Sequence, residues 1–145
     1  MATAPVAPLV VETIAGRFQV PAGDVIHAVQ GLPGFEACRR YVLVTAPEMA
    51  PFTCLHGLDA PEPSFVTVDP RLVVPGYHVA LGAAERARLG VAGNEPLLWL
   101  AIVHVSDAGT SVNLRAPIVV HPGRMTALQL LGADVPYAAA HPLVE

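Results

Sequence analysis

The stretch LLWLAIVHV, residues 97–105, decides which fold the chain is expected to adopt. His104 is its only polar residue, so the alternation of a strand with one face in water is missing. We therefore predict either a central strand buried on both faces or a strand that crosses from one sheet layer to another. Its uninterrupted apolar part, residues 97–103, is much shorter than the ~20 residues that a membrane-spanning helix needs. We expect no membrane span.

Short strand-like runs lie on both sides of this stretch. Each is bounded by Gly, Pro, Asn or Asp, and 15 prolines and 12 glycines supply the turns. The predicted strands are residues 10–14, 17–20, 24–29, 41–45, 52–55, 64–68, 97–105, 110–114, 117–121 and 125–131. Only residues 82–90, with AAERARL between two glycines, have the composition of a helix. The pattern favours an all-β fold: a compact antiparallel β-barrel-like (or sandwich) single domain with one short helix near residues 82–90.

The length of 145 residues fits one domain. Residues 1–8 are mostly Ala, Pro and Thr and are predicted to form a disordered N-terminal extension, which leaves residues 9–145 as the domain. The apolar start lacks a basic region and contains prolines, so it does not resemble a secretory signal. We therefore expect a cytoplasmic protein in which Cys38 and Cys54 are reduced thiols.

The charges of the chain argue against a nucleic-acid-binding protein. The formal net charge is −4, and the eight positive charges, all arginines, are scattered along the sequence. Binding to a phosphate backbone needs a basic patch or stripe, so we expect no direct contact with nucleic acid. A mildly acidic surface instead permits a basic protein partner.

Patterns that carry catalysis or metal binding are weak. His104, Ser106 and Asp107 lie close together in HVSDAG, but a working triad is defined by spatial roles, and SDAGT is better explained as a hairpin turn. Cys54 and His56 could point side by side on a strand, yet two ligands are too few for zinc. We predict no enzymatic activity and no catalytic, cofactor-binding or metal-binding residues.

Several segments, taken in order, resemble one known family. They are GLPGFE (31–36), PFTCLHGLDAPEPSFVTVDPRLVVPGY (51–77), NLRAPIVVH (113–121), Gln129 and YAAAHPL (137–143). In this order and with these gaps they are similar to FliW, the flagellar assembly factor family, over nearly the whole chain after Leu9.

The resemblance implies a compact antiparallel β-barrel-like domain without enzymatic activity, and two protein partners. Members of this family bind newly made flagellin in the cytoplasm. When flagellin is exported, they bind the translational regulator CsrA and relieve its repression of flagellin mRNA. Flagellin and CsrA would then compete for one limited pool of this protein.

Six residues are candidates for contact with these partners. Two Pro-rich loops carry Asp59, Glu62 and Asp69, which could face a basic partner such as CsrA, although solvated loop acids are the simpler interpretation. Tyr77 closes the second loop. Asn113 and Arg115 stand at the polar entry of the 117–121 strand, where Asn113 could instead cap a turn.

The chain departs from the usual family pattern at three places. His121 stands where an Asn is usual, residues 122–128 lack a Lys-rich stretch, and residues 138–140 are alanines where basic residues are common. None of these positions needs to be buried, so we expect the differences to affect contacts near the C-terminus rather than the fold.

Two alternatives to the family's partner switch remain at this stage. One is a small β-barrel enzyme, or ligand- or metal-binding protein, with a pocket lined by histidines and Cys54. The other keeps the fold but makes the protein a flagellin chaperone without control of CsrA.

Overall fold

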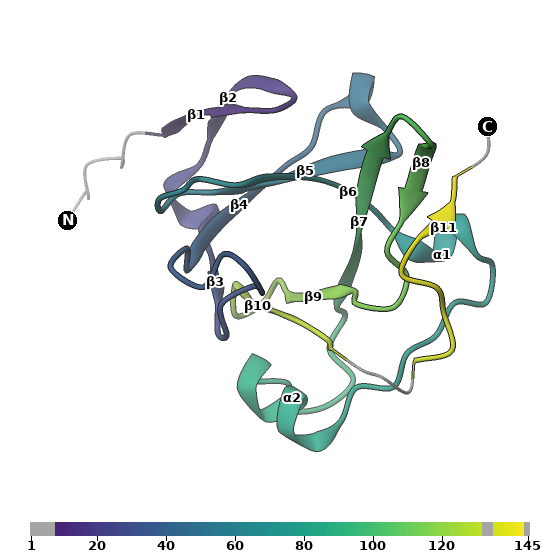
Figure 1. The fold of residues 1–145 in the computed structure, drawn as a ribbon. Helices are drawn as coiled ribbons and strands as arrows, with labels where there is room; N and C mark the ends of the chain where they lie inside the picture. Colours follow the sequence, from purple (N-terminus) through teal and green to yellow (C-terminus); the bar gives the residue numbers. More distant parts are fainter. Residues whose placement is uncertain (1–7, 132–134, 144–145) are drawn as a thin grey trace.

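Strands curve around a common centre to form a closed barrel (Figure 1). The computed structural model describes residues 8–131 and 135–143, so residues 1–7 of the predicted extension lie outside the described residues. The strands are β1 Leu9–Thr13, β2 Gly16–Val20, β3 Ile26–Ala28, β4 Arg40–Val44, β5 Phe52–Gly57, β6 Ser64–Val68, β7 Leu98–Ser106, β8 Gly109–Val112, β9 Ile118–His121, β10 Thr126–Gln129 and β11 His141–Pro142. Each of the ten predicted strands overlaps one of these, and the two-residue β11 was not predicted.

Seven strands close the barrel in the order β7, β6, β5, β4, β3, β10 and β9, with β9 pairing back onto β7. The barrel alternative is therefore confirmed over the sandwich. Neighbouring strands are antiparallel except β3 and β10, where Thr126 pairs with His27 and Ala127 with Ala28 in parallel. A parallel pair needs a long connection, and here the rest of the barrel forms that connection.

Strand β7, which contains most of the apolar stretch of residues 97–105, belongs to two sheets. On one edge it pairs with β6 at Ala101 and Ile102. On the other edge residues 98–100 pair with β9, and residues 103–106 pair with β8. The prediction of a strand that crosses between layers is confirmed. Burial on both faces is wrong at both ends of the strand: Leu98 is 41% exposed, and the last three residues are exposed because β7 leaves the barrel there.

One inner core and three outer clusters hold the domain together. Apolar side chains from six barrel strands fill the interior, among them Tyr41, Leu55 and Ile118, each at most 1% exposed. Outside the barrel, the β1–β2 hairpin covers β4 and β5, and a second cluster lies between β7 and the chain around residues 73–79. The helix near residue 90 covers the third cluster on β9 and β10. Cys38 and Cys54 are both buried free thiols.

Local sequence signals explain one end of each of the two short helices. The predicted helix is α2, Ala83–Leu89, and it ends at Gly90 with φ of +82°, a left-handed conformation that glycine adopts readily. Helix α1, Pro70–Val73, was not predicted, although Asp69 caps it by accepting from the N–H of Arg71 and Pro70 holds its first position. Two 3₁₀ turns span Ala22–Asp24 and Pro47–Met49.

One expectation about burial is wrong. His121 is only 4% exposed, and Ala127 and Leu128 are 4% and 1% exposed, so departures from the family pattern do reach the core. His121 ends β9, which is buried along its full length between β7 and β10. Its Nε2 atom lies 3.9 Å from the carboxylate of Glu95.

The loop between β5 and β6 is fastened to the start of β4 by Asp59. Its carboxylate accepts from the backbone N–H groups of Arg39 and Arg40, both at 3.0 Å. It also accepts from the Arg40 guanidinium at 3.0 and 2.8 Å. These bonds, first the one from the Arg40 side chain, lower the pKa of Asp59 from 3.8 to about 2. The carboxylate thus holds the loop in place as an anion.

Tyr77 fastens the chain that follows α1 to the outside of the barrel. Its side chain is buried, and its hydroxyl donates to the carbonyl of Leu114 at 2.7 Å. Its ring lies 4.4 Å, centre to centre, from that of Tyr137. Burial raises the pKa of Tyr77 to about 12, so the hydroxyl keeps its proton and remains a donor.

Asp59→Asn should lower the melting temperature at pH 7 and change the acid dependence of stability. Because the folded pKa of Asp59 is depressed, its charge stabilises the domain above about pH 4, and this contribution is lost as the pH falls toward 2. The difference between wild type and variant should therefore shrink across that range in thermal melts. Arg40→Met removes the same ion pair and should show the same dependence on pH. A difference in melting temperature between wild type and variant that stays constant down to pH 2 would contradict a stabilising charge on Asp59.

Tyr77→Phe should reduce the free energy of unfolding by about 1–3 kcal/mol, because it leaves the buried Leu114 carbonyl without its donor. Denaturant titration measures the effect. Tyr137→Phe is the control: its hydroxyl accepts an exposed hydrogen bond from the N–H of His78, so its loss should cost less. Equal costs for the two variants would contradict a special role for the Tyr77 hydroxyl.

Candidate functional site

The barrel wall opens between β6 and β7. The two strands pair only through Thr67 with Ile102 and Val68 with Ala101. Residues 64–66 of β6 have partners on β5 alone, and residues 103–106 of β7 have partners on β8 alone. Figure 1 shows the cause: β7 rises with β8 away from the direction of β5 and β6. We call this opening the β6–β7 split.

An apolar groove lies on the inner face of the split, and we call it the inner groove. Its apolar lining comes from Leu32, Pro33, Phe35, Phe65, Ile102 and Leu131. The Phe35 and Phe65 rings meet edge to face with centres 5.2 Å apart. His104, Asn113 and Gln129 add polar atoms, and among the residues that the structure describes no Asp, Glu, Lys or Arg lines the groove.

The inner groove joins the sequence segments that carry the family resemblance. GLPGFE supplies Leu32, Pro33 and Phe35, and the long second segment supplies Phe65. NLRAPIVVH supplies Asn113 and Ala116, and Gln129 completes the set. Segments far apart in the chain thus meet at one surface, as expected of a binding site. A role in a turn or in the core alone would not require these segments to meet at the surface.

A second apolar groove, the outer groove, lies on the other face of the split. It is lined by Phe52, Val66, Val103, Val105, Thr110 and Leu143. Val105 is 79% exposed, the largest value among the exposed large apolar side chains. Neighbouring residues alternate across the sheet, so Phe65 and Val66, or His104 and Val105, face opposite grooves.

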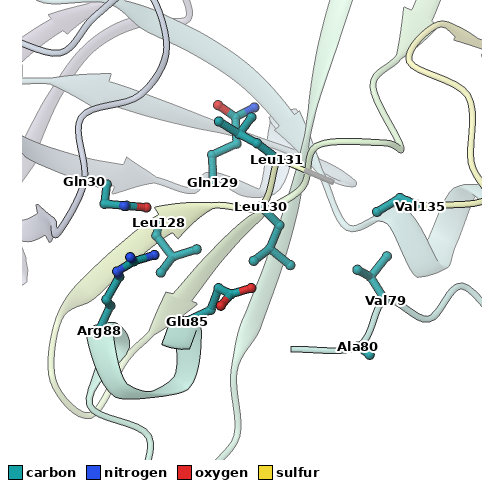
Figure 2. Close-up of a pocket in the computed structure, with 10 residues that line it drawn as sticks. All are labelled: Gln30, Val79, Ala80, Glu85, Arg88, Leu128, Gln129, Leu130, Leu131 and Val135. Atoms are coloured by element: carbon teal, nitrogen blue, oxygen red, sulfur yellow. The ribbon is translucent and has the colours of Figure 1, made fainter. Parts of the chain in front are cut away.

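A third depression lies beside α2 and is shown in Figure 2. Glu85 and Arg88 project from the helix toward Leu128 and Leu130, and Gln129 and Leu131 border this depression as well as the inner groove. The three depressions measure about 220, 300 and 360 Å³. The volume beside α2 lies below the range of about 300–1,000 Å³ for small-molecule sites, and the other two lie close to its lower end, so the depressions suit side chains of a protein partner better.

The three predicted acidic residues do not converge. Asp59 is held by Arg39 and Arg40, as described above. Glu62 lies in the same loop, is exposed, and has a φ of +54°. Asp69 caps α1 and forms an ion pair with Arg71 at 2.8 Å, and the side-chain hydrogen bond from Arg71 is the main reason that the pKa of Asp69 is lowered. Glu62 is thus the freest of the three for a partner.

The other three predicted residues gather around Leu114 and Tyr137. Tyr77 is buried there, so its side chain is placed in the core rather than on a surface. Arg115 is exposed and donates from Nε to the carbonyl of Tyr137 at 3.1 Å. Asn113 accepts at Oδ1 from the N–H groups of Arg115 and Ala116, which is the turn-capping role, and it also lines the inner groove.

The weak catalytic and metal patterns gain no support in the described residues. Ser106 Oγ donates to the carbonyl of Gly109 within the hairpin turn. Cys54 is buried under the β1–β2 hairpin, and His56 Nδ1 bonds to Ser64 Oγ, with burial lowering the pKa of His56. Within residues 8–131 and 135–143, no three His, Cys, Asp or Glu side chains are grouped to hold a metal ion. No helix in these ranges is long and apolar enough to cross a membrane.

Several groove residues were not predicted, namely Phe65, Val66, Val103, Val105 and Leu131. They lie in apolar runs that predict a core. The only local signal in the sequence is the place of Val105 directly before the SDAG turn, where a strand is expected to end.

Comparison with known proteins agrees with the fold and with these segments. The model of the family described as FliW protein matches residues 9–143. The flagellar assembly factor FliW of Geotalea uraniireducens is 33% identical over 138 residues, covering 94% of this chain and 84% of that protein. The FliW of Geobacter sulfurreducens is 32% identical, covering 94% and 86%.

A solved structure is similar over almost the same length. The crystal structure of the flagellar assembly factor FliW superposes with a TM-score of 0.83 at 26% identity, covering 94% of this chain and 98% of that chain. The match in sequence spans both the segments that line the inner groove and the strands that close the barrel. This chain therefore belongs to the FliW family of flagellar assembly factors.

Proposed function

We propose that this protein is a non-enzymatic, cytoplasmic partner switch that binds flagellin and, when flagellin is exported, binds and antagonises CsrA. Membership of the FliW family supports the flagellar role. The observation that carries the binding role is the inner groove, because residues from four separate segments create an exposed apolar surface there.

Two kinds of surface support two kinds of partner. The described lining residues of the two grooves at the β6–β7 split carry no formal charge and suit an apolar segment such as flagellin could present. Glu62 and its loop lie outside the grooves and offer exposed negative charge to a basic protein, as an RNA-binding regulator is expected to be. Flagellin and CsrA would therefore be recognised by different chemistry.

Competition for one limited pool makes this binding a control of synthesis. Free flagellin occupies the protein and leaves CsrA active as a repressor; export of flagellin frees the protein to bind CsrA. The switch needs binding of one partner to lower the affinity for the other, through overlap or through coupling.

Titration calorimetry with flagellin and CsrA from the same organism tests the proposal. Each partner should bind alone, and each should be displaced by the other in competition. Binding of flagellin without CsrA would leave a flagellin chaperone and overturn the translational role. Binding of neither would overturn the proposal and return attention to small ligands, such as one that fits the α2 depression and raises the melting temperature.

Glu62→Lys should weaken CsrA binding by about threefold to tenfold, with most of the change in the association rate and at low salt. Surface plasmon resonance at two salt concentrations measures it. Glu48→Lys is the matched control, because Glu48 is also exposed but lies in the turn after the far end of β4. Equal effects of the two variants would indicate net charge alone, and no effect of Glu62→Lys would remove this loop from the interface.

A further inference from the structure

The main-chain groups at the β6–β7 split point in known directions. The N–H of Asn113 donates to the carbonyl of Ile102, so even-numbered residues of β7 direct their main-chain groups toward β8. The N–H and C=O of a strand residue share one side, and successive residues alternate. Val103 and Val105 therefore direct theirs toward the edge that faces β6. The pairing of Thr67 with Ile102 places the N–H of Val103 against the carbonyl of Val66, so the groups left without a partner on β6 are the C=O of Val103 and the N–H and C=O of Val105.

The edge of β7 is open where a partner strand would lie. Among the described residues, β7 has no strand partner beyond Ile102 on that side, and Val105 is 79% exposed. The facing edge of β6 is less accessible, because the backbone N–H of Ile14 in the β1–β2 turn donates to Ser64 Oγ at 3.3 Å. The edge available for pairing with a partner strand is therefore residues 103–106 of β7.

The side-chain surroundings fit an extended segment. A strand laid along this edge would direct alternate side chains to the two faces of the sheet. On one face they would meet Phe65 and Ile102 in the inner groove, and on the other Val66 in the outer groove. Within residues 8–131 and 135–143, no Asp, Glu, Lys or Arg lines either groove, so a charged segment buried there would find no oppositely charged partner among these residues.

We propose that an extended, apolar segment of the partner protein adds as a strand to β7 at Val103 and Val105, with alternate side chains in the inner and outer grooves. This inference rests on the proposed function, in which that partner is flagellin. A helix would fit less well, because its backbone groups are already bonded and cannot pair with an open edge. Because the open edge is only a few residues long, it can form few main-chain hydrogen bonds with the added strand. Contacts of the added side chains in the two grooves therefore supply much of the affinity.

Amide hydrogen exchange, followed residue by residue by NMR, tests the main-chain contact directly. The N–H group of Val105 should exchange fast in the free protein, whereas that of His104, which faces Ser111 of β8, should exchange slowly. Adding flagellin should slow exchange at Val105. Protection that develops with rising concentration of this protein alone, or with CsrA instead, would overturn the proposal in favour of another occupant.

Val105→Pro removes the N–H donor at the open edge without removing a bond to β8, because proline is tolerated where the N–H faces outward. It should weaken flagellin binding about tenfold or more. Val105→Ile keeps the N–H and an apolar side chain and should lose less affinity for flagellin than Val105→Pro does. Melting curves check that both variants fold; if Val105→Pro does not fold, the exchange data on the wild type decide.

The outcomes separate this inference from the proposed function. Flagellin binding to the wild type, with Val105→Pro unchanged and the Val105 amide unprotected, overturns strand addition and leaves the partner switch intact. Absence of flagellin binding by the wild type overturns both. Loss of binding in Val105→Pro and Val105→Ile alike would indicate a side-chain contact and overturn the main-chain pairing.

Discussion

The structure depends on the unequal use of the two edges of β7. One edge is fully paired, first with β9 and then with β8, whereas the other pairs with β6 at two residues only. Pairing with β9 closes the barrel, and pairing with β8 starts another small sheet. The short pairing with β6 leaves the barrel wall open beyond Ile102, and this opening produces the grooves on both faces of the split. Closure and an open edge thus come from the same strand.

Hydrogen bonds within the chain occupy several of the polar residues that the sequence suggests for partner contact. Asp59 and Asp69 each serve an arginine and one or more backbone N–H groups, and Asn113 caps a turn. Such bonds hold in place loops that have few apolar contacts. The apolar side chains at the split cannot be occupied by hydrogen bonds of this kind. Recognition is therefore expected to depend on shape and burial more than on fixed ion pairs.

Much of the fold could be predicted from the sequence, because its signals are local. The ten strands follow from apolar runs between turn residues, and α2 from AAERARL with Gly90 at its end. The parallel pairing of β3 with β10 could not be predicted, since nothing near His27 indicates a partner about 100 residues away. The site was predicted less well: its acidic loops were noticed, but Phe65 and Val105 look like core residues until the divergence of β7 from β6 exposes them.

That same parallel pair sets when the protein can fold. Ile26–Ala28 is made early on the ribosome, but its neighbour Thr126–Gln129 is among the last strands to be synthesised. Until then β3 and β9 each lack a barrel neighbour, and the nascent chain exposes strand edges that can pair wrongly. The ring closes only when translation has passed residue 129, so long-range contacts must form after most of the chain exists, and folding should be slow for a domain of this size.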